Sequence, residues 1–149
     1  PVLHKAAWLK AFGAKLGLSS PTEADTDLIN GFLTLLTNQR ADFTNSFAAL
    51  SSDTPRDHFT DREAFDAWAK DWTLREPNTD LMGQTNPQII PRNHQIEAAI
   101  QAAVTGDLSP FQILLKECTA PFAPLTPSRK TLAQPPKDSE VVRQTFCGT

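Results

Sequence analysis

Apolar residues recur at helical rather than strand spacing along most of this chain, and no other feature constrains the fold as strongly. Near the start, Leu9, Phe12 and Leu16 fall at positions i, i+3 and i+7, and Phe65 and Trp68 continue such a stripe further on. No segment shows the alternation of apolar and polar residues that marks a strand. The pattern therefore predicts an all-α fold of about five to six helices in an irregular bundle.

Capping motifs predict where several of these helices begin. Ser20-Pro21-Thr22-Glu23, Thr60-Asp61-Arg62-Glu63 and Ser109-Pro110-Phe111-Gln112 each have the form of a capping box or a close variant. Residues 77–91 contain three prolines and are predicted to form a loop. A helix is expected to follow this loop and to end at Gly106.

Prolines dominate the region after residue 120. Five prolines fall within residues 121–136, a density that predicts neither regular helix nor a central strand. The sequence thus indicates a helical domain at residues 1–120 and a proline-rich extended tail at residues 121–149, partly in polyproline II conformation. The tail ends in Thr145-Phe146-Cys147-Gly148-Thr149.

Composition excludes several functional classes. A net charge of −3 with mixed signs argues against a nucleic-acid partner, which needs a basic face. No apolar run approaches the roughly 20 residues that span a bilayer, and no signal peptide is recognisable. Two cysteines make no disulfide framework, so a reducing, cytosol-like compartment is expected. Because the first residue is Pro1 and not Met, we also expect a piece of a longer protein.

Motifs for nucleotide, metal or acyl-transfer chemistry are absent from the sequence. The six glycines are scattered, and the histidines stand far apart at His4, His58 and His94. Neither cysteine has a CxxC partner. We therefore predict no catalytic, cofactor-binding or metal-binding residue in this chain, and no cofactor of its own.

One polar segment, residues 86–94, is dense enough to form a site. Arg92 and His94 could hold an anion at a helix N-terminus. The interpretation that we favour is structural: Asn86 and Asn93 bond backbone groups at a turn and a helix cap, and Arg92 forms an ion pair.

The aromatic stripe and the two cysteines have separate interpretations. Trp68 and Trp72 continue the stripe begun by Phe65, which favours a place in the core. Cys118 extends an apolar helix face and should behave as a small hydrophobic residue. Cys147 has no apolar neighbourhood, so it is either an incidental thiol or a reactive one.

Four stretches together resemble the carboxy-terminal portion of the selenoprotein O family, the pseudokinase-fold protein adenylyltransferases. They occur in the family's order and span nearly the whole chain: Lys15-Leu16-Gly17-Leu18, Arg40-Ala41-Asp42-Phe43-Thr44-Asn45-Ser46-Phe47, Asn86-Pro87-Gln88-Ile89-Ile90-Pro91-Arg92-Asn93-His94 and Thr145-Phe146-Cys147-Gly148-Thr149.

This resemblance implies a parent protein that transfers AMP from ATP to Ser, Thr or Tyr hydroxyls of proteins, with ATP and Mg²⁺ bound in an amino-terminal kinase-like portion. None of the family's nucleotide-binding or catalytic residues matches a position here. The implied role of this chain is to support that absent portion, its main partner. The resemblance also implies a cytoplasmic location if the protein is bacterial, and a mitochondrial one for eukaryotic relatives.

Cys147 matches the family's selenocysteine or cysteine near the carboxy terminus. The resemblance implies a redox role for it, through a disulfide to the catalytic portion. An alternative from another class stays open, namely a non-catalytic helical module that binds another protein. A small thiol oxidoreductase fits poorly, because no activating base or resolving cysteine accompanies Cys147.

Overall fold

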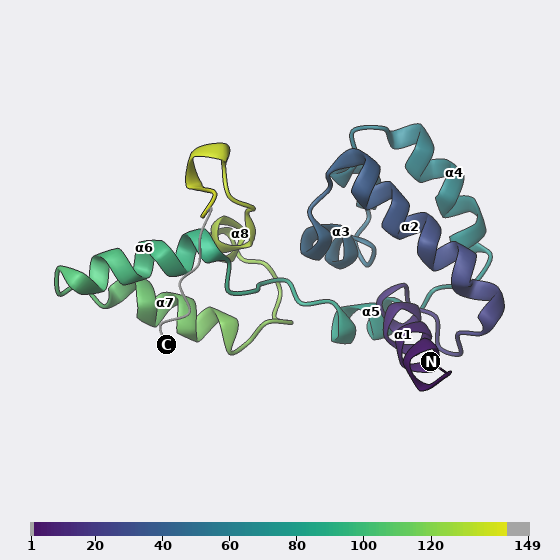
Figure 1. Cartoon of the computed structure of the whole chain (residues 1–149), viewed down its shortest axis with the longest axis horizontal. Coiled ribbons are helices and arrows are strands. Elements are labelled where there is room, and N and C mark those ends of the chain that lie inside the picture. Colours follow the sequence, from purple (N-terminus) through teal and green to yellow (C-terminus); the bar gives the residue numbers. More distant parts are fainter. Residues whose placement is uncertain (1, 143–149) are drawn as a thin grey trace. The chain divides into compact units, whose positions relative to one another are not determined.

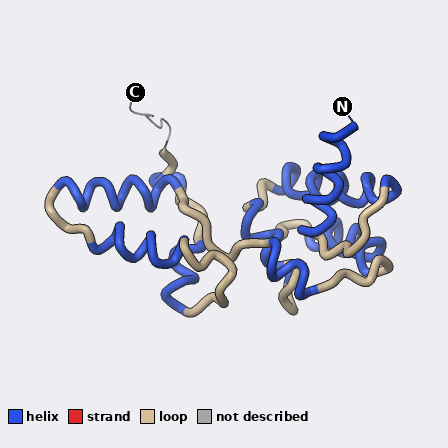
Figure 2. The backbone as a smooth tube through the Cα atoms, turned by 90° about the horizontal axis from the view of Figure 1, so that it is seen from below, coloured by secondary structure: helices blue, strands red, loops and turns tan. Residues whose placement is uncertain are grey.

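The structure is a computed structural model that describes residues 2–142, and within that range helices are joined by loops and turns without any strand. It contains eight α-helices and three short 3₁₀ helices. Figure 2 shows only helices and loops in the described range. The predicted all-α class is confirmed, although the helices are more numerous than the predicted five to six. Backbone contacts divide the chain into two compact units, one ending at Pro87 and the other beginning at Gln88.

The first unit contains five α-helices and two 3₁₀ turns, coloured purple to teal in Figure 1. In chain order they are α1 (Val2–Lys15), η1 (Glu23–Asp25), α2 (Thr26–Gln39), α3 (Phe43–Ala49), η2 (Pro55–His58), α4 (Arg62–Thr73) and α5 (Thr79–Thr85).

Side-chain caps fix the starts of three of these helices. Asp42, Asp61 and Asn78 each accept a hydrogen bond from the backbone N–H three residues later, at 2.8 to 2.9 Å. The cap of α4 is therefore Asp61 and not Thr60. The first predicted capping box is displaced as well, because η1 precedes α2 and that helix begins only at Thr26.

Aromatic rings fill the core of the first unit. Phe32 and Phe47 are fully buried and meet edge to face at 4.8 Å between ring centroids. Trp68 and Trp72 stack at 5.4 Å, and the Trp72 indole N–H donates to the buried carbonyl of Leu16 at 2.8 Å. The predicted core location of the tryptophan stripe is confirmed.

The second unit is built around a pair of neighbouring helices. Its elements are α6 (Asn93–Val104), α7 (Ser109–Cys118), α8 (Pro127–Ala133) and η3 (Asp138–Glu140). Figure 1 shows α6 and α7 side by side. The Gln95 side chain donates to the Leu132 carbonyl at 2.7 Å, which ties α6 to α8.

Two segments predicted to be irregular contain short helices. The predicted loop at residues 77–91 includes α5, because Asn78 caps it. The prediction that residues 121–136 hold no regular helix is wrong for α8. Pro127 occupies the first helical turn, where its missing N–H costs nothing, and Thr126 caps the helix. The predicted boundary between domain and tail at residue 120 stays a prediction.

Among residues 2–142, no helix combines the length and the apolar character needed to cross a membrane.

Candidate functional site

Asn86 follows α5 and is fully buried within the first unit. Its side-chain amide donates to the backbone carbonyls of Lys15 at 2.8 Å and Phe47 at 3.1 Å. A buried amide satisfied in this way is costly to remove, because its acceptors would lose their partner without gaining water. Asn86 therefore joins the end of α1, the middle of α3 and the end of α5.

Lys15 covers the same junction from outside. Its ammonium nitrogen lies 3.4 Å from the Asn86 Oδ1 atom, 5.3 Å from the Phe47 ring centroid and 5.9 Å from that of Phe43. The two rings offer a cation–π surface to the charge. Burial lowers the pKa of Lys15 from its usual 10.5. The packing thus draws a cation against an aromatic cluster at the cost of some hydration.

Arg92, Asn93 and His94 lie together at the start of α6, in the second unit. Arg92 occupies the cap position and is buried, whereas Asn93 is the first helical residue and is exposed. The predicted cap at Asn93 is therefore wrong. All three residues line a hollow of about 320 Å³ together with Glu140 and Val141. Within the described range, the His94 Nδ1 atom is buried and has no hydrogen-bond partner.

A buried ion pair in the second unit was not anticipated from the sequence. Arg129 on α8 pairs with Glu117 on α7 and also donates to the Ala120 carbonyl at 2.8 Å. Since both charged side chains are largely buried, the extra hydrogen bond matters for satisfying the guanidinium. The only available signal was an arginine just inside a proline-started turn, which is too weak to predict a partner.

Acidic, histidine and cysteine side chains do not gather in the described part of the chain. Residues 2–142 contain no group of three or more His, Cys, Asp or Glu side chains that could hold a metal ion. The positive-φ glycines Gly17 and Gly106 follow α1 and α6, where a left-handed residue commonly ends a helix.

The two cysteines differ in what the structure says of them. Cys118, at the end of α7, is partly buried, and burial raises the pKa of its thiol above the usual 9.0, with Arg129 opposing and Glu117 reinforcing that rise. Near neutral pH it is a protonated thiol and a poor nucleophile. Cys147 lies outside the described residues.

Comparison with known proteins finds relatives that carry the same name. No protein-family model matches the chain. Over its whole length it is 46% identical to the protein nucleotidyltransferase YdiU of Roseobacter denitrificans and 44% identical to that of Ruegeria pomeroyi. Over 99% of its length it is 37% identical to the YdiU of Bacillus cytotoxicus. In each case the match covers 32% of the relative, so the chain spans about a third of the length of these curated relatives.

Proposed function

We propose that this chain, which belongs to the selenoprotein O family, is the carboxy-terminal helical portion of a protein adenylyltransferase. Along its length the chain is similar to about a third of each YdiU protein nucleotidyltransferase. The whole-length similarity is the observation that carries this proposal. The longer protein transfers AMP from ATP to protein hydroxyls, with Mg²⁺ as its metal ion. Residues 1–149 support the kinase-like portion that performs this transfer.

The chemistry of the described residues supports this division of labour. Phosphoryl and nucleotidyl transfer depend on metal-bound phosphates held by acidic and basic side chains and by backbone N–H groups. Among residues 2–142, no group of three or more His, Cys, Asp or Glu side chains that could hold a metal ion is found. In this proposal ATP, Mg²⁺ and the protein substrates bind to the rest of the polypeptide.

The test compares the longer protein with its 149-residue portion. Both are incubated with Mg²⁺ and ATP radiolabelled at the α-phosphate, and label transferred to protein is counted. We expect transfer by the longer protein and none by residues 1–149. Transfer by the 149-residue chain, or none by the longer protein, would contradict the proposal.

The proposal includes a redox role for Cys147. Under an oxidant such as oxidised glutathione, the Cys147 thiol and a thiol of the catalytic portion lose two electrons and two protons and form a disulfide, while glutathione is reduced to two thiols. Peptide mapping of the oxidised longer protein without reductant tests this pairing. Cys118→Ser should leave it intact and Cys147→Ser should abolish it. A Cys147 that stays free, or that pairs only with Cys118, would rule the pairing out.

A second function is favoured by one observation: α6 and α7 expose apolar side chains, among them Ile100 and Phe111. A non-catalytic helical module that binds a separate protein would present such a face. The two functions differ in where the partner is encoded: in the same polypeptide or in another.

A further inference from the structure

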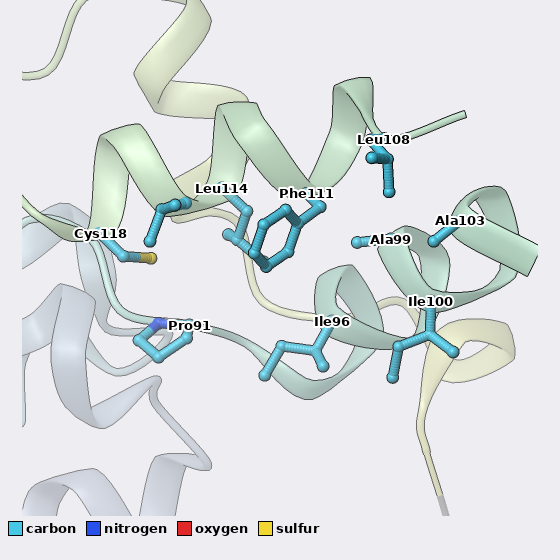
Figure 3. Close-up of a pocket in the computed structure, with 10 residues that line it drawn as sticks. Pro91, Ile96, Ala99, Ile100, Ala103, Leu108, Phe111, Leu114 and Cys118 are labelled. Carbon is cyan, nitrogen blue, oxygen red and sulfur yellow. The ribbon is translucent and has the colours of Figure 1, made fainter. Parts of the chain in front are cut away.

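The α6–α7 pair leaves an open groove along its length, with a volume of about 490 Å³ (Figure 3). Of the side chains drawn there, those of Ile96 and Ile100 come from α6, and those of Phe111, Leu114 and Cys118 come from α7. Every lining residue is apolar apart from the thiol of Cys118. We call this surface the α6–α7 groove.

The apolar side chains that line the α6–α7 groove are unusually exposed to solvent. Ile100, Leu108 and Phe111 line it, yet their exposed fractions are 51%, 53% and 51%. Within α6 and α7, only Ala99 and Leu114 are buried. A helix pair that buries so little lacks a core of its own and needs a further layer against its apolar side.

The lining also indicates what kind of partner fits. A site for a metabolite or nucleotide normally carries a few polar groups that orient the ligand. Here the thiol is the one polar candidate, and burial raises its pKa so that it stays neutral. A groove of this shape and chemistry suits the apolar side chains of another protein segment, such as one face of a helix.

We propose that the α6–α7 groove is the docking surface for the part of the longer protein that lies outside these 149 residues. This inference rests on the proposed function. About two thirds of each relative's length lies outside the region matched by this chain, so under the proposed function a large further portion is covalently attached. Attachment gives that portion a high effective concentration at the groove, which a separate partner would lack.

The test is a photo-crosslinking experiment on the longer protein. The photoreactive residue p-benzoylphenylalanine replaces Phe111, which lies in the groove, or Ile113, a matched control that is equally exposed at 52% but does not line the groove. After irradiation, crosslinked peptides are identified by mass spectrometry. We expect position 111 to crosslink to peptides from outside residues 1–149, and position 113 to do so far less. Crosslinks from position 111 to residues 1–87, to a second copy, or to nothing would overturn the inference.

A second measurement uses Cys118 as a reporter of groove occupancy. The measurement uses the longer protein with Cys147→Ser as background. Ile100→Glu places a carboxylate in the apolar contact, which should weaken docking and uncover Cys118. The rate of Cys118 labelling by N-ethylmaleimide should then rise about tenfold or more. Ile113→Glu is the matched control and should leave the rate unchanged. Equal rates in both variants would contradict docking.

Failure of this inference is distinguishable from failure of the proposed function. AMP transfer with crosslinks only to residues 1–87 would leave the function standing and remove the docking surface. Crosslinks to peptides from outside residues 1–149 without any AMP transfer would leave the docking surface standing and remove the proposed function.

Discussion

Replacing Asn86 by alanine should destabilise the first unit more than most single substitutions in this chain. The change removes both amide donors, leaving the Lys15 carbonyl with no other donor among the described residues and the Phe47 carbonyl with only the Leu50 N–H at 3.3 Å. An orphaned buried acceptor costs about 1–3 kcal/mol, so we expect a loss of about 2–4 kcal/mol for the two together, the Phe47 carbonyl contributing the smaller share.

Urea unfolding followed by tryptophan fluorescence measures this loss. All three tryptophans of the sequence, Trp8, Trp68 and Trp72, lie in the first unit and report on its unfolding. Asn86→Asp is the stricter variant, because it places a carboxylate oxygen where an amide now faces two carbonyls. It should be at least as unstable as Asn86→Ala.

Asn38→Ala is the matched control, since Asn38 is exposed near the end of α2 in the same unit. It should change the free energy of unfolding by less than about 0.5 kcal/mol, as surface substitutions usually do. The reasoning would be refuted if Asn86→Ala were as stable as Asn38→Ala. A large loss of AMP transfer by Asn86→Ala at unchanged stability would refute it too, because the residue would then serve catalysis.

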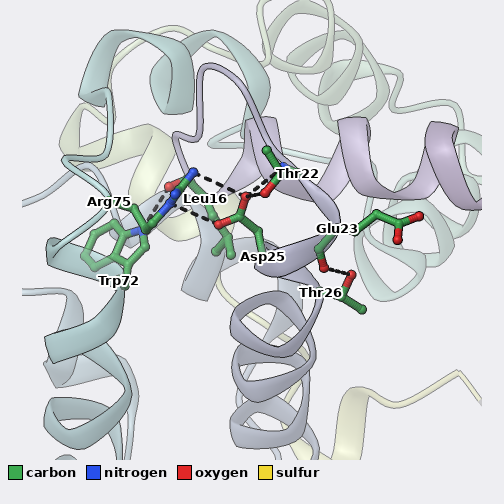
Figure 4. A network of polar contacts seen from close by, with 7 residues as sticks. All are labelled: Leu16, Thr22, Glu23, Asp25, Thr26, Trp72 and Arg75. Atoms are coloured by element: carbon green, nitrogen blue, oxygen red, sulfur yellow. Dashed lines mark hydrogen bonds and ion pairs between the residues drawn. The ribbon is translucent and has the colours of Figure 1, made fainter.

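Three further predictions concern Arg75, Trp72 and Cys118. The buried Asp25 carboxylate accepts bonds from the Arg75 guanidinium at 3.0 and 3.2 Å (Figure 4). Arg75→Ala leaves this carboxylate without its counter-charge and should lower the free energy of unfolding by about 1–3 kcal/mol, whereas an unchanged value in urea unfolding would contradict the reasoning. Trp72→Phe deletes an indole N–H that serves a buried carbonyl and should cost a similar amount by thermal unfolding followed by circular dichroism; an unchanged midpoint would contradict this. With Cys147→Ser, the Cys118 thiol should react with iodoacetamide more slowly in the folded than in the unfolded chain at pH 8 to 9. Because burial raises the pKa of Cys118 in the folded chain, the neutral thiol contributes its full share of stability below pH 9.0. This contribution is lost as the pH rises through the folded pKa, and unfolding measured at several alkaline pH values would check it.

Local signals in the sequence predicted most of the secondary structure. The stripes of apolar residues at helical spacing lie in helices of the structure. The capping motifs near positions 61 and 109 lie at the starts of α4 and α7. The errors were local too. Asn78 and Thr126 cap short helices inside segments that were predicted to be irregular from their prolines alone. Proline density predicts a break, but the position of each proline relative to a cap decides whether a helix starts there.

The candidate site was only partly predictable. The segment at residues 86–94 drew notice as a polar cluster, yet its members belong to different units: Asn86 to the first, and Arg92, Asn93 and His94 to the second. The acceptors of Asn86 lie 71 and 39 residues away along the chain, and no local pattern points to them. The α6–α7 groove was missed because an apolar helix stripe reads the same whether it is covered or open.

The sequence by itself therefore determined the helical class, much of the helix register and the resemblance to a nucleotidyltransferase family. Each of these depends on residues close along the chain or on an ordered set of short motifs. Only the tertiary structure decided which polar groups are buried and paired, as with Asp25 and Arg75, which are 50 positions apart. It also decided that the groove-lining side chains of Ile100 and Phe111 stay about half exposed within the described part of the chain. Burial is a property of what packs against a residue, and that partner is set by the fold and not by the residue's own neighbours.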